Sequence, residues 1–188
     1  DAMPEGHILT RTTSLPNYFR ERGYLTAGSG KIFGSSFGSV VKNRVWEETM
    51  ETGRKKGRAE DARPPKDQIP LSGMGGKHDW GAFPDSRETM SDWQMAGWAA
   101  EFLAKPQSKP FFLACGIVKP HTPWYVPKEY FDLFPPERIT VPALAADENA
   151  GLPAGVQVKP KQIKQEQAMV TRRNEMVAAY LACSRYAD

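Results

Sequence analysis

The chain has 188 residues, of which 40% are hydrophobic and 25% charged, and its net charge is +3. These are the proportions of an ordinary globular domain, and so small a net charge gives no support to a nucleic-acid or membrane-surface partner. No run of 18 apolar residues occurs, so no membrane-spanning helix is expected, and Cys115 and Cys183 lack the spacing of a metal site.

A short helix and a short strand are predicted near the start of the chain. Ser14 offers a capping hydroxyl, Pro16 falls in the first turn, and Gly23 suits the end of the helix. Residues 24–29 then read as a strand, and Lys31 follows it almost at once.

Residues 42–88 carry no clear hydrophobic period and are rich in charge, Pro and Gly. We expect a long, loop-rich excursion from the core. The basic stretch within it, residues 54–58, is interleaved with acidic residues, which favours a solvated loop over a nucleic-acid track.

The second half opens with the clearest helical pattern, which begins at Ser91 with Asp92 at the positive end of the helix dipole. Residues 111–118 follow as an unbroken apolar run. Continuous hydrophobicity predicts a strand covered on both faces, as in the centre of a parallel sheet, and makes Cys115 a buried thiol. Helices alternating with such strands indicate an α/β fold with a mostly parallel sheet between helices.

A long helix is predicted from residue 162 to the end of the chain. Its apolar face is expected to include Val170, Val177, Tyr180 and Leu181, which recur at helical spacing. Since two recognisable strands are few for a closed core, we expect the sheet to be incomplete in this chain.

Basic side chains follow both predicted strands. Lys31 comes after the first, and Lys119 and His121 come after the second. Ligands of open parallel sheets bind beyond the carboxyl ends of the strands, so neighbouring strands would bring a lysine and an imidazole to one anion site. The alternatives are a solvated lysine and a structural histidine, and Trp124 could line a pocket or pack over the sheet edge.

These segments resemble those of the sulfatase family, and the nearest subgroup is the iduronate-2-sulfatase-like one. The matching stretches are Leu15-Pro16-Asn17-Tyr18-Phe19-Arg20-Glu21-Arg22-Gly23-Tyr24-Leu25-Thr26, Gly30-Lys31-Ile32-Phe33, Lys109-Pro110-Phe111-Phe112-Leu113-Ala114 and Lys119-Pro120-His121-Thr122-Pro123-Trp124. Two motifs of this length in the same order are more specific than either alone. The resemblance covers most of the chain outside residues 42–78.

The resemblance implies an alkaline-phosphatase-like fold and hydrolysis of sulfate esters. It implies a formylglycine nucleophile, made from Cys or Ser in a C/S-x-P-x-R motif, and a divalent cation, usually calcium. Lys31 matches the lysine that contacts the sulfate, and His121 matches the histidine near the leaving oxygen. Lys119 and Trp124 are then candidate substrate-binding residues, while no metal ligand is assigned to this chain.

The sequence departs from the family pattern in two respects. No C/S-x-P-x-R motif occurs in it, so the nucleophile segment and the metal-binding segments at either side are expected to be absent. Close relatives often carry a histidine three residues after the lysine, where this chain has Gly34, and the hydroxyl of neighbouring Ser35 is no proton relay at neutral pH.

Residues 1–188 are therefore expected to be part of one sulfatase catalytic domain, with a sulfated carbohydrate or small molecule as substrate and the remainder of such a chain as a partner. Two alternatives remain: a phosphatase or phosphonate hydrolase of the same fold, and a degenerate protein that binds an anion without turnover. By family analogy the compartment is exported or lysosomal.

Overall fold

The computed structural model of the chain describes residues 12–33, 45–50, 64–74, 78–141, 151–153, 156 and 171–188. Main-chain contacts divide the chain into a first unit, Asp1–Arg63 with Ser86–Lys119, and a second unit, Pro64–Asp85 with Pro120–Asp188. Within the described residues, each unit contains a parallel sheet of two strands.

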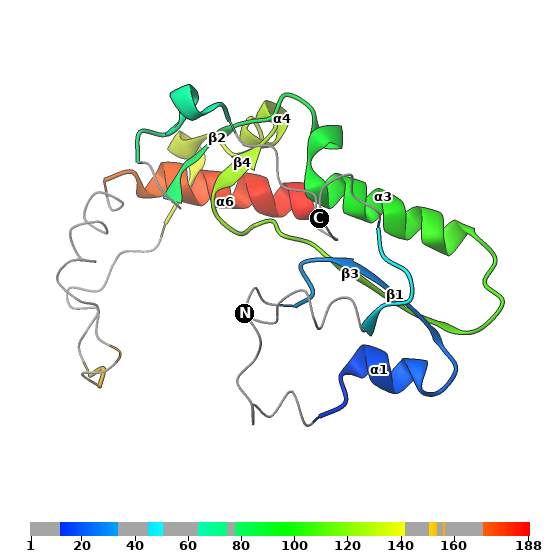
Figure 1. The fold of residues 1–188 in the computed structure, drawn as a ribbon. Coiled ribbons are helices and arrows are strands. Elements are labelled where there is room, and N and C mark those ends of the chain that lie inside the picture. Colours follow the sequence, from blue (N-terminus) through cyan, green and yellow to red (C-terminus); the bar gives the residue numbers. More distant parts are fainter. Residues whose placement is uncertain are drawn as a thin grey trace. The chain divides into compact units, whose positions relative to one another are not determined.

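The first unit is a small α/β sandwich. Its elements are α1 (Leu15–Arg20), β1 (Leu25–Gly30), the 3₁₀ turn η5 (Arg87–Thr89), α3 (Ser91–Ala104) and β3 (Phe111–Gly116). Strands β1 and β3 pair in parallel along their whole length, and α1 and α3 lie on opposite faces of the pair (Figure 1). The predicted α/β fold with a parallel sheet between helices is confirmed for this unit.

Alternate side chains of β3 serve the two faces of this sheet. Phe112 stacks on Phe19 of α1, with ring centroids 4.8 Å apart. On the α3 side, Phe111 meets Phe102 edge to face at 5.3 Å, and the sulfur of Cys115 contacts the Met95 carbonyl at 3.7 Å.

The prediction that β3 is buried throughout, with Cys115 as a buried thiol, is wrong. Helices lie on both faces, yet Phe111 keeps 39% of its surface exposed and Cys115 is also exposed. In the described part of the chain β3 pairs with β1 alone, so its second edge has no neighbouring strand. An unbroken apolar run therefore predicts a strand of a parallel sheet, but it does not show that strands lie on both sides of it.

The predicted starts of the first two helices are confirmed. Ser14 caps α1, since its hydroxyl accepts the Asn17 N–H at 3.4 Å, and Gly23 beyond the helix has a φ of +81°, which favours glycine. Helix α3 begins at Ser91 and ends before Lys105, as expected.

The second unit contains β2 (Trp80–Ala82), β4 (Trp124–Val126), α4 (Lys128–Phe131), the 3₁₀ turns η3 (Lys66–Gln68) and η6 (Pro136–Arg138), and α6 (Arg173–Ala187). Strands β2 and β4 pair in parallel, and α6 packs against β4 and α4 (Figure 1). Strand β2 and η3 come from the stretch 42–88 that we expected to be loop-rich.

The predicted apolar face of the last helix is wrong at Tyr180, while Val177 and Leu181 of that face are half-buried. Tyr180 is 46% exposed, whereas the buried residues of α6 are Ala178, Ala179, Ala182 and Cys183. Small side chains let a helix approach its neighbours closely, so this stripe packs inward although it is less hydrophobic than the expected one. Residues 162–170, including Val170, lie outside the described residues.

Val45 and Glu48, from the 42–88 stretch, contact β1. Ala27 and Glu48 form an isolated parallel bridge, and the Thr26 hydroxyl donates to the Val45 carbonyl at 3.0 Å. None of the described helices is long and apolar enough to cross a bilayer.

Candidate functional site

Lys31 lies at the carboxyl end of the first unit's sheet, as the sequence predicts. The register runs from Leu25 opposite Phe111 to Gly30 opposite Gly116, so both strands end at the same edge. The Lys31 N–H donates to the Gly116 carbonyl at 2.8 Å, which extends the pairing by one residue, and the residue itself is exposed. Its ammonium is thus placed beyond the strand ends, where parallel sheets bind ligands.

A pair of glycines makes this placement possible. Gly30 has a φ of +89°, and a Cβ built on it would lie 2.1 Å from the Gly116 oxygen. A Cβ on Gly116 would lie 2.4 Å from the backbone nitrogen and carbonyl carbon of Lys31. The two main chains approach too closely for a side chain at either position. The sequence motif Gly30-Lys31 contains one of these glycines, and Gly116 lies outside it.

One buried hydroxyl lies two residues before Lys31. Ser29 is 4% exposed, and its Oγ has no hydrogen-bond partner among the described residues. Its partner across the register is Cys115, so both side chains lie on the α3 face of the sheet. Sequence reasoning missed Ser29, because nothing in its neighbours separates a buried serine from a solvated one.

The end of β3 is held by Asp92 in the first turn of α3. One carboxylate oxygen accepts the Val118 N–H at 2.9 Å, and the other accepts the Lys119 N–H at 2.8 Å. Asp92 is 4% exposed and Lys119 is 5% exposed. Asp92, expected merely to suit the helix dipole, therefore holds the chain that leads from β3 to His121.

His121 belongs to the second unit and is exposed. Its Nδ1 lies 2.6 Å from the Thr122 carbonyl oxygen. Since a carbonyl only accepts, this contact places the proton on Nδ1 and leaves Nε2 available to a ligand. That tautomer is inferred from the partner, and it suits a ring that exchanges a proton through Nε2.

The indole of Trp124 forms a hydrogen bond within the turn that precedes it. Its Nε1–H donates to the Pro120 carbonyl at 2.8 Å, and its main-chain N–H donates to the Asp79 carbonyl at 2.9 Å. The ring also meets Tyr180 of α6 edge to face at 6.2 Å. Because the indole has a single donor, Trp124 can offer a substrate its ring surface and no hydrogen bond.

A buried carboxylate organises the second unit beside Trp124. Asp79 is fully buried and accepts hydrogen bonds from the main-chain N–H groups of Leu71, at 2.8 Å, and Ser72, at 2.9 Å, and from the hydroxyls of Ser72 and Tyr125. Burial by itself would raise the pKa of Asp79, but these donors outweigh it and lower the pKa below its ordinary value of 3.8.

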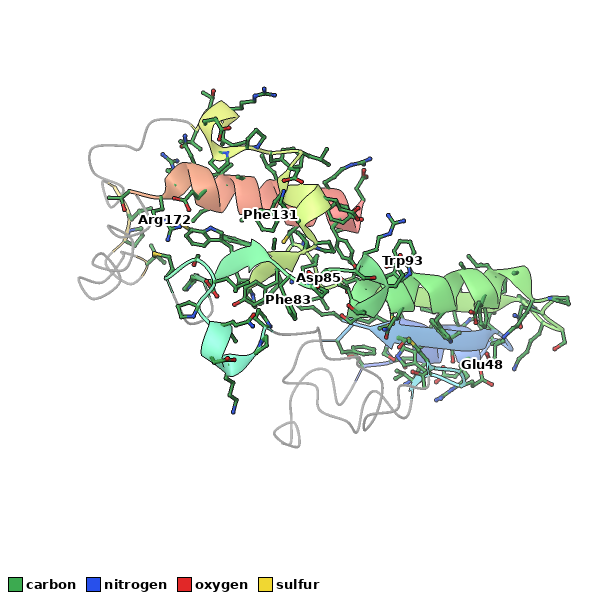
Figure 2. All side chains as sticks on the ribbon, turned by 90° about the horizontal axis from the view of Figure 1, so that it is seen from above. Glu48, Phe83, Asp85, Trp93, Phe131 and Arg172 are labelled. Atoms are coloured by element: carbon green, nitrogen blue, oxygen red, sulfur yellow. The ribbon has the colours of Figure 1, made fainter. Side chains whose placement is uncertain are left out.

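Arg172, at the start of α6, completes this cluster. Its guanidinium donates to the Ser72 carbonyl, pairs with Glu175, and lies over the Trp80 ring, 4.9 Å from the centroid. Arg172 is labelled in Figure 2. The hydrogen bond from Arg172 lowers the pKa of Glu175 despite its partial burial. These contacts connect α6 with β2 and with the loop before β2. The role of Arg172 and Glu175 here is therefore structural.

Four sequence-predicted site residues are thus divided between the two units. Lys31 and Lys119 belong to the first unit, and His121 and Trp124 to the second. The convergence of Lys31 and His121 on one anion stays a prediction, and Gly34 and Ser35 lie outside the described residues.

The described residues do not fit the divalent cation that the resemblance implies. Throughout the described ranges, no three His, Cys, Asp or Glu side chains gather as metal ligands would. Asp79 and Asp92, the buried aspartates, have both carboxylate oxygens engaged by N–H and O–H donors.

Comparison with known proteins gives a consistent picture. The family model described as Sulfatase matches residues 3–188. A sulfatase of Formosa agariphila is 34% identical over 194 residues, which cover 93% of this chain and 36% of that protein. The iduronate 2-sulfatases of Homo sapiens and Mus musculus are 29% and 30% identical, each over 69% of this chain and 24% of their own length. The chain spans about a third of the first relative and about a quarter of the others.

Proposed function

Because the chain belongs to the sulfatase family, we propose that it forms the lysine- and histidine-bearing part of a sulfuric ester hydrolase. The proposed reaction is hydrolysis of a sulfate ester. The named activity of the two iduronate 2-sulfatases favours a carbohydrate sulfate as substrate. The observation that carries the proposal is Lys31, held beyond the ends of two parallel strands by the Gly116 carbonyl.

In this proposal Lys31 binds the sulfate group. An ammonium at the strand ends offers a compact positive charge to the sulfate oxygens, and it stabilises negative charge that develops there as the ester bond breaks. Lys119 is nearly buried, so its proposed contact with substrate is secondary to that of Lys31.

His121 is proposed to serve the leaving oxygen. With its Nδ1–H donating to Thr122, a protonated ring presents an Nε2–H that can pass a proton to the departing alkoxide. Trp124 is proposed to line the substrate side of the same turn with its ring, since its N–H is already engaged with Pro120.

Neither the formylglycine nucleophile nor the cation is assigned to residues of this chain. In a complete sulfatase the formylglycine would supply the attacking oxygen and the cation would polarise the sulfate. The sequence contains no C/S-x-P-x-R motif, and the described residues hold no metal-ligand cluster. The proposed roles of Lys31 are sulfate binding and charge stabilisation, and the proposed role of His121 is proton transfer.

The test combines the intact mass of the sample with turnover of an aryl sulfate in calcium. In a species of mass larger than 21.0 kDa that contains this chain and turns over, we expect Lys31→Ala to lower turnover by about 10²-fold or more. Lys105→Ala, which alters an exposed lysine just beyond α3, is the matched control and should leave turnover unchanged. Equal loss in both variants would contradict the proposed role of Lys31.

The alternatives are separate outcomes of the same experiment. Faster turnover of an aryl phosphate would indicate a phosphatase of this fold, and sulfate binding without turnover would indicate a non-catalytic protein. Turnover by a species of 21.0 kDa would require a nucleophile other than the family motif, and that result would overturn the assignment of chemistry given above.

A further inference from the structure

Two aromatic rings of the second unit lie together at the end of the turn that carries His121. Trp124, the first residue of β4, and Tyr180 of α6 meet edge to face, with ring centroids 6.2 Å apart. Tyr180 is exposed, and Trp124 is half-buried. The Trp124 indole donates to the Pro120 carbonyl at 2.8 Å, so the pair lies against the turn in which His121 is exposed as well.

The Trp124 ring is fixed in place within the second unit. In the pairing of β2 with β4 it lies opposite Trp80, and its main-chain N–H donates to the Asp79 carbonyl at 2.9 Å. Its one side-chain donor is bonded to Pro120, so the ring is held at the main chain and at the indole nitrogen. A ring that is already fixed loses little conformational entropy when a ligand covers it.

Tyr180 is brought to the surface by the small residues around it on α6. Ala178, Ala179 and Ala182 are buried, which leaves the larger tyrosine outside the core. A single exposed tyrosine needs no explanation, since apolar atoms make up much of any protein surface. Tyr180 differs because it contacts a second ring, and because its hydroxyl forms no hydrogen bond with any of the described residues. That hydroxyl is able to donate to a ligand or accept from one.

A surface of this kind suits a sugar ring. A pyranose presents a face of C–H groups with a slight positive charge, which packs on the negative face of an aromatic ring. Its hydroxyls need hydrogen-bond partners at the edge of that contact, and the phenol of Tyr180 is one. Inorganic sulfate has no such face, so neither ring contributes to binding the bare anion.

We propose that Tyr180 and Trp124 form an aromatic platform that binds a sugar ring of the substrate, and that Tyr180 makes the site prefer a carbohydrate sulfate to sulfate alone. This inference rests on the proposed function for the reaction at the ester, and it adds the residue that recognises the sugar. Tyr180, Trp124 and His121 all belong to the second unit.

The main experiment measures binding by the full chain and needs no turnover. The ligand is a heparin-derived disaccharide that carries a uronic acid 2-sulfate, and inorganic sulfate is the matched ligand without a sugar ring. Binding is followed through the ¹H–¹⁵N signal of the Trp124 indole. This signal is assigned among the five tryptophans by its loss in Trp124→Phe.

Two variants separate the ring of Tyr180 from its hydroxyl. Tyr180→Leu removes the aromatic face but keeps an apolar side chain that favours a helix, and Tyr180→Phe removes the hydroxyl alone. Tyr18→Leu is the matched control, since Tyr18 of α1 is 45% exposed and belongs to the first unit. Thermal unfolding by circular dichroism should give each variant a Tm within about 3 °C of the native chain.

We expect Tyr180→Leu to weaken disaccharide binding about tenfold and to change sulfate binding by less than about twofold. Tyr180→Phe keeps the ring and loses one hydrogen bond, so it should weaken disaccharide binding about threefold. Tyr18→Leu should change neither. In a larger species that contains this chain and turns over, Tyr180→Leu should raise KM for a carbohydrate sulfate and leave kcat nearly unchanged, since the sugar is bound equally before and during the reaction.

The proposal would be overturned if the native chain bound the disaccharide no better than sulfate, or if Tyr180→Leu weakened both ligands equally. A large loss of stability in Tyr180→Leu would also count against it, because Tyr180 would then be a packing residue. The proposed function fails in a different way. If disaccharide binding depends on Tyr180 but a species that contains this chain hydrolyses no sulfate ester, the proposed function is wrong and the platform stands.

Discussion

Lys31 and the residues that flank His121 are held by different kinds of interaction. Lys31 is placed by the main chain, through the pairing of β1 with β3 and the close approach of Gly30 and Gly116. The residues on either side of His121 are held by side chains, the carboxylates of Asp92 and Asp79. Main-chain placement depends on which residues lack side chains, whereas placement by carboxylates depends on charge and therefore on pH.

The largest expected effect is at the glycine pair. Gly30→Ala puts a methyl group against the Gly116 carbonyl at a positive φ, which should cost about 3 kcal/mol or more in the free energy of unfolding. Urea unfolding measures the loss. Lys31 should lose its role in turnover even where the variant still folds, because its backbone must move.

Gly97→Ala is the matched control for this substitution. Gly97 lies within α3, where a Cβ would meet nothing within 4 Å. Alanine is the better helix former, so this change should stabilise the chain by about 0.5–1 kcal/mol. Destabilisation of similar size by both substitutions would contradict the close approach of β1 and β3 at their ends.

The next effect concerns Asp79 in the second unit. Asp79→Asn leaves several buried donors with too few acceptors, and we expect a loss of about 2–4 kcal/mol in the free energy of unfolding at neutral pH. Asp85→Asn, an exposed carboxylate of the same unit (Figure 2), should change it by less than about 0.5 kcal/mol.

The same variant should flatten the acid limb of the stability curve. The folded pKa of Asp79 is lowered, so its contribution is complete above the unfolded pKa of about 4 and is lost as the pH falls through the folded pKa. Urea titrations from about pH 5 to pH 2 should therefore show a smaller decline for Asp79→Asn than for the native chain. An equal decline in the free energy of unfolding of the two proteins would show that ionised Asp79 does not stabilise the fold.

A weaker effect is expected at Glu47, which resembles Asp79 in chemistry but not in burial. Glu47 accepts the Thr26 N–H at 3.0 Å and pairs with Lys109 at 3.3 Å, and the Thr26 bond is the main cause of its lowered pKa. Because the carboxylate is exposed to solvent, Glu47→Gln should cost about 1 kcal/mol or less, and less still at high salt. Glu48→Gln beside it (Figure 2) is the control; equal effects in the two variants would contradict a specific role for Glu47.

The smallest predicted difference concerns the thiols. Cys115 is exposed, while Cys183 is buried in α6, so alkylation of the folded chain should modify Cys115 first. Partial burial, with a contribution from the Asp92 charge, raises the pKa of Cys115, so its reaction near pH 7.5 should be severalfold slower than that of an unfolded thiol. Peptide mapping by mass spectrometry measures both rates. Faster modification of Cys183 would contradict the packing of α6.

Sequence patterns predicted the regular parts of the fold well. Ser14 and Gly23 marked a helix, Ser91 began another, and the strands after them pair in parallel as expected. Each of these signals is local, since a cap, a turn glycine or an apolar run acts within a few residues of itself. They also placed Lys31 at a strand end, because the end of a strand is a local feature.

The errors have one cause, which is that burial is not a local property. Cys115 lies in a wholly apolar run yet is exposed, because exposure depends on which strand or helix lies opposite. In α6 the small residues Ala178 and Ala182 face inward in place of the larger Tyr180, since packing selects by fit as well as by hydrophobicity.

The sequence by itself determined the order of the helices and strands of the first unit, its parallel α/β character and the position of Lys31 after a strand. Only the tertiary structure decided that Gly116 must be small to let Lys31 bond to it, and that Asp92 and Asp79 accept hydrogen bonds from residues on either side of His121. The physical reason is distance along the chain: Asp92 lies 27 residues from Lys119, and Asp79 lies 46 from Tyr125, so no local pattern connects the donors with their acceptors.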